Sequence, residues 1–384
     1  MANKVHEPLF TVFKRSEFSK PLSVGLRVGV ALTAFILSMV LSSLVIKEGL
    51  GGILKTFFNG ATIKPWKLIL DSCLLLGFGI AIVPAFKMKY WNMGANGQVM
   101  VGALVSIVIM FYTEQYAQAS KANNTKILIL MFAASVTASI IWAVIPCIFK
   151  VFCKTNETLF TLMMNYIAAG LIAYVNFVLA KGKKEAQDVT LRQQGGWLFG
   201  NDAVTQNFNP NYMVVMIVVI VLTLLVYLYV SRTKHGYEVS VVGDSLPTAR
   251  YVGMHTKTIM IRTLIFNGFM CGVLGFLYAS AINHSMSADM CGSLGFTAVL
   301  IAWLSNFNPF IMAIVSFGLA FLTIGTSKIS SVYRIGNTYL ANVIIGIIFF
   351  SILICEFFIR YKVRFNFKFK KKNEHVEETV KEAK

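Results

Sequence analysis

Charged residues are scarce in this chain of 384 residues. Asp, Glu, Lys and Arg together make up 14% of it, against 56% hydrophobic residues, whereas a soluble domain carries about 25% charged residues. This scarcity excludes an ordinary soluble globular protein. The charges also avoid the apolar runs, since every Asp, Glu, Lys, Arg and His lies in a loop or near the end of a run. Proton-driven transport normally needs an ionisable group at membrane depth, so this second absence argues against it.

Catalytic and metal-binding motifs are absent as well. The five histidines show no HExxH or other metal-ligand spacing, and the six cysteines form no CxxC pair, so we expect no metal and interpret the cysteines as small packing residues. No G-x-x-x-x-G-K-[ST] motif occurs, and the chain alone is not expected to hydrolyse ATP. These absences predict a protein that is not an enzyme and has no cofactor of its own.

Long apolar runs are what the sequence does contain. A helix of about 20 residues crosses a bilayer core about 30 Å thick, and a helix satisfies its own backbone hydrogen bonds in lipid. The sequence therefore predicts an all-α, polytopic membrane helix bundle with about ten transmembrane helices. The eighth run is short and stops at Asn308-Pro309, so we expect a broken or half helix there. The ten expected spans are Val24–Ile46, Leu68–Phe86, Gly94–Tyr112, Ile127–Phe149, Thr158–Ala180, Met213–Val230, Ile259–Asn283, Gly295–Ser305, Phe310–Thr326 and Thr338–Ile359.

Basic residues indicate how these spans are oriented. When both termini are placed in the cytoplasm, 23 of the 35 Lys and Arg residues fall on the cytoplasmic side, the side on which such residues are enriched. We therefore expect cytoplasmic termini and a single transmembrane domain over residues 1–384. Its soluble parts would be a cytoplasmic N-terminal segment (1–23), a cytoplasmic loop (231–258) and a basic cytoplasmic tail (360–384).

The formal net charge of +18 raises the question of nucleic-acid binding. Part of that charge lies in Arg360–Lys372, directly after the last span, where Lys and Arg contact anionic lipid headgroups. The placement favours membrane lipids over nucleic acid as the partner of this segment.

Two loops on the expected outer side are long. Lys47–Lys67 contains LGGILKTFFNG, which we expect to lie flat on the membrane as a short amphipathic helix. Lys181–Tyr212 contains GGWLFGND, where Trp197 and Phe199 are expected at the membrane interface, as aromatic residues often are.

Neutral polar residues cluster where charged residues are missing. Amides and glycines open the third span: Asn92, Gly94, Asn96, Gly97 and Gln98. Glycine lets helices approach closely, and the amides hydrogen-bond either across helices or to a polar solute. The sequence leaves both alternatives open. For Asn165 in the fifth span, and for the GxxxG pair Gly268 and Gly272, helix packing is the favoured interpretation.

The loop between the sixth and seventh spans, Ser231–Thr258, carries helix signals. Asp244 and Ser245 are suitable N-caps, Pro247 suits a first turn and Gly253 suits a helix stop. The pattern predicts a short polar helix on the cytoplasmic surface, where a cytoplasmic protein is its natural partner. The alternative is a simple connector, although 28 residues exceed what a connector needs.

These features together resemble the permease subunit of bacterial ATP-binding-cassette importers of the branched-chain amino acid, ribose and nucleoside group. Asn92-Met93-Gly94-Ala95-Asn96-Gly97-Gln98 is similar to the family's N-I-G-A-E-G-Q, and Asn156-Glu157-Thr158-Leu159 through Asn165-Tyr166 is similar to its N-E-V-I-x-T-L-M-L-N-Y. The stretch from Gly236, with Val242-Gly243-Asp244 and Ala249-Arg250-Tyr251-Val252-Gly253-Met254, is similar to its G-x-x-x-R-A-V-G-E-N-P-x-A-A-R-Y-A-G-I. The three motifs occur in the family's order, and the resemblance covers roughly Leu68 to Phe310.

The nucleoside-type branch is the most similar one. The resemblance implies a second permease subunit, a different chain from this one, together with a cytoplasmic ABC ATPase that uses ATP and a substrate-binding lipoprotein. It also implies roles for two sets of residues. The translocation pathway would involve Asn92, Gly94, Asn96, Gly97, Gln98 and Asn165, and coupling to the ATPase would involve Gly243, Asp244, Ser245, Pro247, Ala249, Arg250 and Gly253.

The sequence also departs from the family pattern. Asn96 replaces the usual glutamate, Ser240 replaces a frequent arginine and Ser245 replaces an asparagine. The alternatives to a nucleoside permease are a ribose- or galactose-type sugar permease, and then a self-sufficient carrier or channel. The missing ionisable groups at depth and the capped cytoplasmic helix argue against the carrier, and no converging nucleophiles or metal ligands support a membrane-embedded enzyme.

Overall fold

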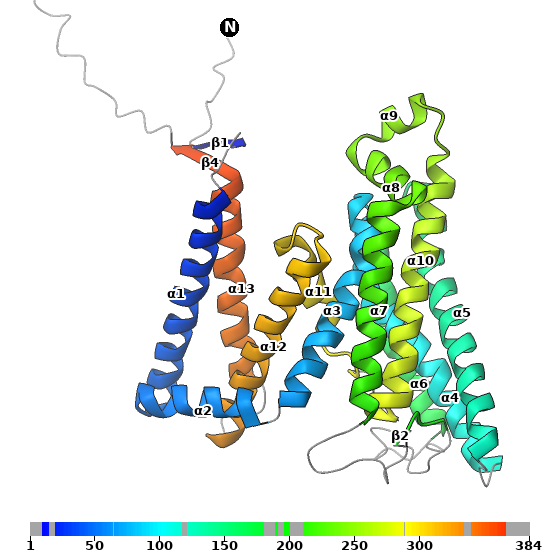
Figure 1. Cartoon of the computed structure of the whole chain (residues 1–384), viewed down its shortest axis with the longest axis horizontal. Helices are drawn as coiled ribbons and strands as arrows, with labels where there is room; N and C mark the ends of the chain where they lie inside the picture. Colours follow the sequence, from blue (N-terminus) through cyan, green and yellow to red (C-terminus); the bar gives the residue numbers. More distant parts are fainter. Residues whose placement is uncertain are drawn as a thin grey trace, which may run out of the picture. The chain divides into compact units, whose positions relative to one another are not determined.

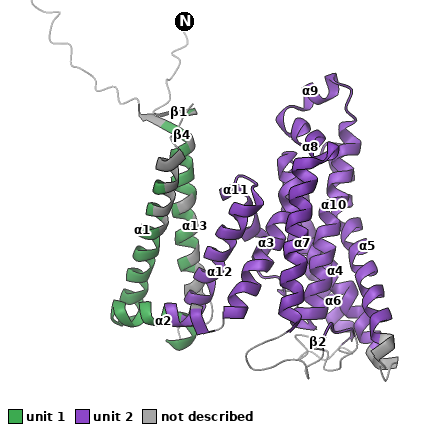
Figure 2. Cartoon of the chain, viewed as in Figure 1, with its two compact units in different colours: residues 1–57, 329–384 green, residues 58–328 purple. Residues whose placement is uncertain are grey.

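The computed structural model describes residues 10–14, 20–63, 65–116, 121–179, 189–190, 196–199, 210–287, 289–333 and 339–365. Helices make up nearly all of these residues (Figure 1). The chain divides into two compact units: residues 1–57 with 329–384, and residues 58–328 (Figure 2). Parts of the expected segments 1–23, 181–212 and 360–384 lie outside the described residues.

The first unit brings the two ends of the chain together. Helix α1 (Lys20–Ile46) packs against α13 (Tyr339–Arg360). Strands β1 (Phe10–Lys14) and β4 (Tyr361–Phe365) pair antiparallel, with Phe10 opposite Phe365 and Lys14 opposite Tyr361. The all-α expectation missed this ribbon, although Tyr361–Phe365 alternates apolar and basic residues as a half-exposed strand does. The basic residues there favoured a tail on the lipid headgroups instead.

Helix α2 (Leu50–Ile63) follows α1 after a sharp break. Lys47 has a positive φ of 59°, and the apolar parts of the two helices are bent by 114° relative to each other. The rings of Phe35 on α1 and Phe57 on α2 meet edge to face with centroids 5.0 Å apart, which fixes the corner. A helix at LGGILKTFFNG is thus confirmed, and its place flat on a membrane stays a prediction.

The second unit is a bundle whose centre and periphery are clearly distinguished. The apolar windows of α3 (Pro65–Lys87), α4 (Ala95–Tyr116) and α10 (Thr256–Leu277) are 72–83% buried. Those of the surrounding helices are only 22–33% buried, as expected for helices with a lipid-facing side. These peripheral helices are α5 (Lys121–Cys153), α6 (Glu157–Leu179), α7 (Pro210–Arg232) and α12 (Pro309–Val332).

Short elements lie at the two ends of the bundle and inside it. One end carries α8 (Lys234–Asp244) and α9 (Leu246–Tyr251), and the opposite end carries the paired strands β2 (Val189–Thr190) and β3 (Ser285–Met286) (Figure 1). A π-helical turn η2 (Tyr278–Asn283) ends α10, and the half-length helix α11 (Leu294–Leu304) packs against α3.

Among the described residues, seven helices are long and apolar enough to cross a membrane, or eight if α1 and α2 count as one bent span. The seven coincide with the expected spans two to seven and nine. The first expected span falls within α1, the described part of the tenth falls within α13, and the eighth corresponds to the 11-residue α11. A polytopic all-α membrane protein is therefore confirmed, while the count of ten spans stays a prediction.

Glycines let the central helices touch backbone to backbone. A Cβ on Gly268 would lie 2.7 Å from the Cα of Ile140, and a Cβ on Gly272 would lie 2.6 Å from the Cα of Val136. Both neighbours belong to α5, so the GxxxG pair is confirmed as a packing motif. Gly275, one turn further along α10, approaches the carbonyl oxygen of Val99 on α4 in the same way.

Replacing Gly272 by Ala is expected to lower stability by about 1–3 kcal/mol, because the added methyl overlaps backbone atoms of α5. Gly170→Ala on α6 is the matched control, since a Cβ there meets nothing within 4 Å and Ala is the better helix former. Thermal unfolding of the two variants in detergent checks this prediction. Equal midpoints for both variants would contradict the close contact.

Candidate functional site

The peptide that connects α3 to α4 returns into the bundle before α4 begins. Helix α3 ends at Lys87, Lys89 takes a positive φ of 58°, and Tyr90–Gly94 is not helical. Asn92 is fully buried. Its amide nitrogen Nδ2 donates to Oδ1 of Asn267 at 2.7 Å, and Nδ2 of Asn267 donates to the carbonyl oxygen of Ala81 at 2.5 Å. These bonds tie the returning segment to the middles of α10 and α3.

Asn96 joins α4 to the start of α11. Its Oδ1 accepts from the backbone N–H of Gly295 at 2.8 Å, and its Nδ2 donates to the carbonyl oxygen of Gly292 at 2.9 Å. Ser293, the N-cap of α11, makes no capping hydrogen bond with its side chain. The side chain of Asn96 on α4 instead accepts a hydrogen bond from the first turn of α11. The half helix expected at the eighth span is confirmed, and the N-terminal ends of α4 and α11 meet at Asn96.

Asn165 on α6 closes the other side of this junction. Its Oδ1 accepts from the N–H of Gly97 at 2.8 Å, and its Nδ2 donates to the carbonyl oxygen of Met93 at 2.8 Å. A Cβ on Gly97 would lie 3.1 Å from the Cα of Asn165, and one on Gly94 would lie 3.2 Å from the carbonyl oxygen of Thr161. Both glycines are needed because α6 approaches the backbone of this segment closely.

Gln98 is the one expected pathway residue with an unused polar atom. Its Nε2 donates to Oδ1 of Asn92 at 3.4 Å, and its carbonyl oxygen accepts from Oγ of Ser139 at 2.8 Å. Its Oε1 is buried without a hydrogen-bond partner among the described residues. A buried acceptor of this kind normally binds water or a ligand.

The structure thus places all six expected pathway residues around the start of α4, in a set that we call the amide lattice: Asn92, Gly94, Asn96, Gly97, Gln98 and Asn165, with Asn267 as its seventh member. Within this set Asn92 bonds Gly94, Gln98 and Asn267, and Asn165 bonds Gly97, while Asn96 bonds Gly292 and Gly295 of the α11 end. Asn267 was missed in the sequence, although an amide within an apolar helix and next to a GxxxG pair is itself a signal. Both polar atoms of Asn96 and of Asn165 are occupied by backbone groups. These contacts favour helix packing for those two residues and leave Gln98 as the residue with a free acceptor.

The loop between α7 and α10 contains two helices where one was expected. Thr233 caps α8, since its Oγ1 accepts from the N–H of Gly236 at 3.0 Å. Ser245 ends α8 and caps α9, with Oγ accepting from the N–H of Thr248 at 3.3 Å and Pro247 in the first turn. Gly253, which follows the end of α9, has a positive φ of 81°, as expected for a helix stop. The prediction of Asp244 as an N-cap was wrong, because Asp244 is the last residue of α8.

Helix α8 lies directly on the end of α3. A Cβ on Gly243 would overlap the carbonyl oxygen of Lys87 and lie 3.2 Å from the Cα of Met88. Nζ of Lys89 donates to the carbonyl oxygen of Asp244 at 3.4 Å. Only glycine permits this approach, so Gly243 fixes how α8 sits on the segment that leads to the amide lattice.

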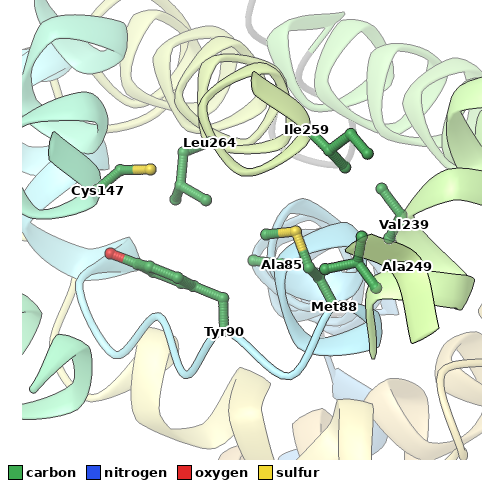
Figure 3. Close-up of a cluster of buried hydrophobic side chains, with 9 residues drawn as sticks. Ala85, Met88, Tyr90, Cys147, Val239, Ala249, Ile259 and Leu264 are labelled. Atoms are coloured by element: carbon green, nitrogen blue, oxygen red, sulfur yellow. The ribbon is translucent and has the colours of Figure 1, made fainter. Parts of the chain in front are cut away.

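A buried apolar cluster surrounds this contact (Figure 3). Its members come from α3, the α3–α4 connection, α5, α8, α9 and α10: Ala85, Met88, Tyr90, Cys147, Val239, Val242, Ala249, Ile259 and Leu264. Ala249 anchors α9 in the cluster, while Arg250 and Tyr251 beside it are exposed, Tyr251 by 94%. Helix α9 therefore has one face embedded in the protein and a tip that projects away from it.

His235 ties α8 to α7. Its Nδ1 lies 2.6 Å from Oη of Tyr229, and burial lowers the pKa of its imidazole below the ordinary value. The tyrosine ring in turn stacks on Phe266 of α10 with centroids 4.1 Å apart. Together with the apolar cluster, this contact makes α8 part of the bundle and not a loose loop.

Comparison with known proteins identifies the family. The sequence model of the family described as branched-chain amino acid transport system / permease component matches residues 68–353. The chain belongs to this family. It is a multi-pass integral protein of the bacterial plasma membrane and the permease subunit of an ABC transporter, as its motifs predicted. The amide lattice and the helices α8 and α9 lie within the matched region.

The chain is similar to ABC permeases with named solutes, including the following three. The glucose ABC transporter permease protein TsgB13 of Haloferax volcanii is 24% identical over 74% of this chain and 74% of that protein. The guanosine ABC transporter permease protein NupP of Bacillus subtilis is 22% identical over 59% of this chain and 63% of that protein. The nucleoside ABC transporter permease protein NupB of Lactococcus lactis is 21% identical over 60% and 63%. The matches to the second and third span less than two thirds of those proteins.

Among solved structures, PsaBC from Streptococcus pneumoniae in complex with Fab covers 80% of this chain and 95% of that chain. The identity is 12% and the TM-score 0.43, a likeness that is too weak to carry an argument.

Replacing Asn96 by Leu is expected to lower the melting temperature, because the backbone groups of Gly292 and Gly295 lose their partner at a cost of about 1–3 kcal/mol each. Asn96→Asp is the matched variant. It keeps an acceptor for Gly295 at the N-terminal end of α11, where negative charge is favourable, and should melt between the wild type and Asn96→Leu. Thermal unfolding in detergent, beside uptake of a panel of nucleosides and sugars, checks this. If Asn96→Leu melts like the wild type but changes the solute preference, Asn96 contacts solute instead.

Proposed function

We propose that this permease imports a nucleoside or a related sugar-containing solute, driven by ATP that a separate cytoplasmic ATPase subunit hydrolyses. The family membership supports the import machine, and the guanosine, nucleoside and glucose permeases among the relatives support the solute class. A ribose- or galactose-type sugar is the second candidate, favoured by the glucose permease.

The observation that carries the mechanism is the direct contact of α8 with the α3–α4 connection. Helices α8 and α9 share one apolar cluster with Met88 and Tyr90, and Asn92 of the amide lattice follows Tyr90 by two residues. A displacement of α9 is therefore passed on through packed side chains to the place where α4 and α11 begin. Two discrete arrangements of this junction would alternately open the path to either side of the membrane.

The same geometry supports a place for the ATPase. The exposed tip of α9, with Leu246, Tyr251 and Val252 at 39–94% exposure, is where the ATPase would seat. Coupling would involve Gly243, Asp244, Ser245, Pro247, Ala249, Arg250 and Gly253, of which Gly243 and Ala249 face the bundle and the others face the ATPase or shape α9. A second permease subunit and a substrate-binding lipoprotein would complete the transporter, and no cofactor would be bound by this chain.

The solute would be held by neutral hydrogen-bonding groups. Gln98 Oε1 is the free buried acceptor at the junction, and an amide both donates and accepts, which suits a ribose hydroxyl or the edge of a base. No ionisable side chain belongs to the amide lattice. This composition suits a neutral solute better than an ion.

In membrane orientation, α8, α9 and both termini would face the cytoplasm, with ten spans if α1, α11 and α13 are counted. In cells that express the permease without its ATPase, cysteine at the exposed Tyr251 should then resist membrane-impermeant thiol reagents while the cells are intact and react after permeabilisation. Cysteine in place of Lys184, outside the described residues, should react in intact cells. The exposed native Cys153 is replaced by Ser in both variants. The opposite labelling pattern would reverse the orientation.

Gly253→Val is expected to reduce the amount of solute imported per ATP hydrolysed, because a β-branched residue resists the positive φ of 81° that ends α9. A side chain there meets nothing within 4 Å, so any loss of stability should come from backbone strain at the end of α9 alone. Gly253→Asn is the control, since asparagine tolerates this conformation. Uptake and ATP hydrolysis are measured together in proteoliposomes that contain the whole transporter. Normal coupling in the valine variant would make Gly253 an ordinary loop residue.

A further inference from the structure

Four residues at the end of the bundle opposite α8 and α9 are held by three different elements. Asn124 on α5 accepts from the N–H of Gly196 at 2.8 Å and donates to the carbonyl oxygen of Trp197 at 3.0 Å. The N–H of Leu198 donates to the carbonyl oxygen of Ser280 in η2 at 3.1 Å. Asn211 on α7 accepts from the N–H of Phe199 at 3.0 Å and donates to its carbonyl oxygen at 3.2 Å. We call Gly196–Phe199 the plug segment.

The side chain of Trp197 is buried at this end of the bundle. It is only 6% exposed, and its ring lies flat on that of His284, with centroids 3.8 Å apart and planes 14° apart. A Cβ on Gly196 would lie 2.8 Å from Sδ of Met131 and 3.1 Å from Cγ of Met110, so the plug segment reaches between α4 and α5. The expectation of Trp197 at the membrane interface was wrong, because the ring is buried inside the protein, whereas Phe199 is 42% exposed.

The surroundings of the plug segment carry strain and an unmet hydrogen bond. Residues Tyr278–Asn283 form a π-helical turn, a conformation that is rare and often found at functional positions. His284 follows in the left-handed region at φ 46°, which costs free energy in a residue other than glycine. The indole N–H of Trp197 is buried without a partner among the described residues, and release of the ring to water would satisfy it. The hydrogen bonds of the plug segment thus stabilise this arrangement, while the strained backbone at His284 and the unbonded indole N–H destabilise it. Such a balance is expected of an element that has two states.

We propose that the plug segment is a gate, which shuts the end of the bundle opposite α8 and α9 when Trp197 lies on His284 and must leave for solute to reach the amide lattice. The proposal rests on the proposed import function. The gate is a separate site, because the amide lattice and the contact of α8 with α3 lie elsewhere in the bundle.

A reversible lock tests the gate directly. The hydrogen bond between the N–H of Leu198 and the carbonyl oxygen of Ser280 places the two backbones side by side, and a disulfide spans Cα separations of about 4.4–6.8 Å. The Leu198→Cys/Ser280→Cys double variant, reconstituted with its partner subunits, should import radiolabelled uridine or glucose when reduced. Oxidation should lower uptake by about tenfold, because alternating access requires both states, and a reductant should restore it. The two single variants control for the native cysteines.

Uptake by the oxidised double variant at the reduced rate, with the disulfide shown to be formed, would overturn the gate. If the double variant does not assemble, Trp197→Ala decides instead. With Gln98→Cys added to each variant, a small thiol reagent applied from the side of the plug segment should modify Cys at position 98 several-fold faster in Trp197→Ala than in Trp197→Phe or Phe199→Ala, and equal rates would overturn the gate. This labelling needs neither the ATPase nor a transported solute. A wild-type complex that imports none of the panel therefore refutes the proposed function, while the labelling still tests the gate.

Discussion

Backbone groups that begin a helix inside an apolar bundle need hydrogen-bond partners, and the rest of this structure depends on how that need is met. The first N–H groups of any helix lack partners within it, and lipid supplies none. Here α4 and α11 both begin within the bundle, and side-chain amides take the place of water. Asn96 and Asn165 bond the backbone at both of their polar atoms, while Asn92 and Asn267 connect the junction to α3 and α10. Helices α4 and α11 can begin inside the bundle because these amides supply hydrogen-bond partners for their backbone groups.

In the proposed mechanism, the same junction lets a distant helix act on the solute path. Apolar packing is bistable and does not deform smoothly, so a displaced α8–α9 pair cannot leave Met88 and Tyr90 where they are. At Gly243 the backbone of α8 touches the backbone at Lys87 directly, with no side chain between them that could absorb a movement of α8. At the far end, the Trp197–His284 stack depends on a strained π-helical turn that continues α10. Helix α10 contributes Ile259 and Leu264 to the apolar cluster and Asn267 to the amide lattice. The turn η2 that ends it bonds the plug segment through Ser280.

Local patterns made much of this predictable from the sequence. The apolar runs located the spans, the stop at Asn308-Pro309 marked the half helix, and glycine with positive φ was expected at Gly253. Long-range contacts were not predictable in this way. Nothing near Asn267 in the sequence indicates Asn92 as its partner, and Trp197 looked like an interfacial aromatic because its stacking partner lies 87 positions away. The second helix of the coupling loop was missed because Ser245 both ends α8 and caps α9, whereas the pattern was interpreted as one helix.

The central claim is that α8 drives the amide lattice through its contact with the end of α3. Gly243→Ala tests it most directly, because a methyl group there must push α8 away from Lys87. The quantity to measure is solute imported per ATP hydrolysed by the complete transporter in proteoliposomes, with Gly170→Ala as the control. The account predicts that ATP hydrolysis persists in Gly243→Ala while import per ATP falls well below that of the control. Unchanged import per ATP in a folded, assembled Gly243→Ala transporter would contradict it.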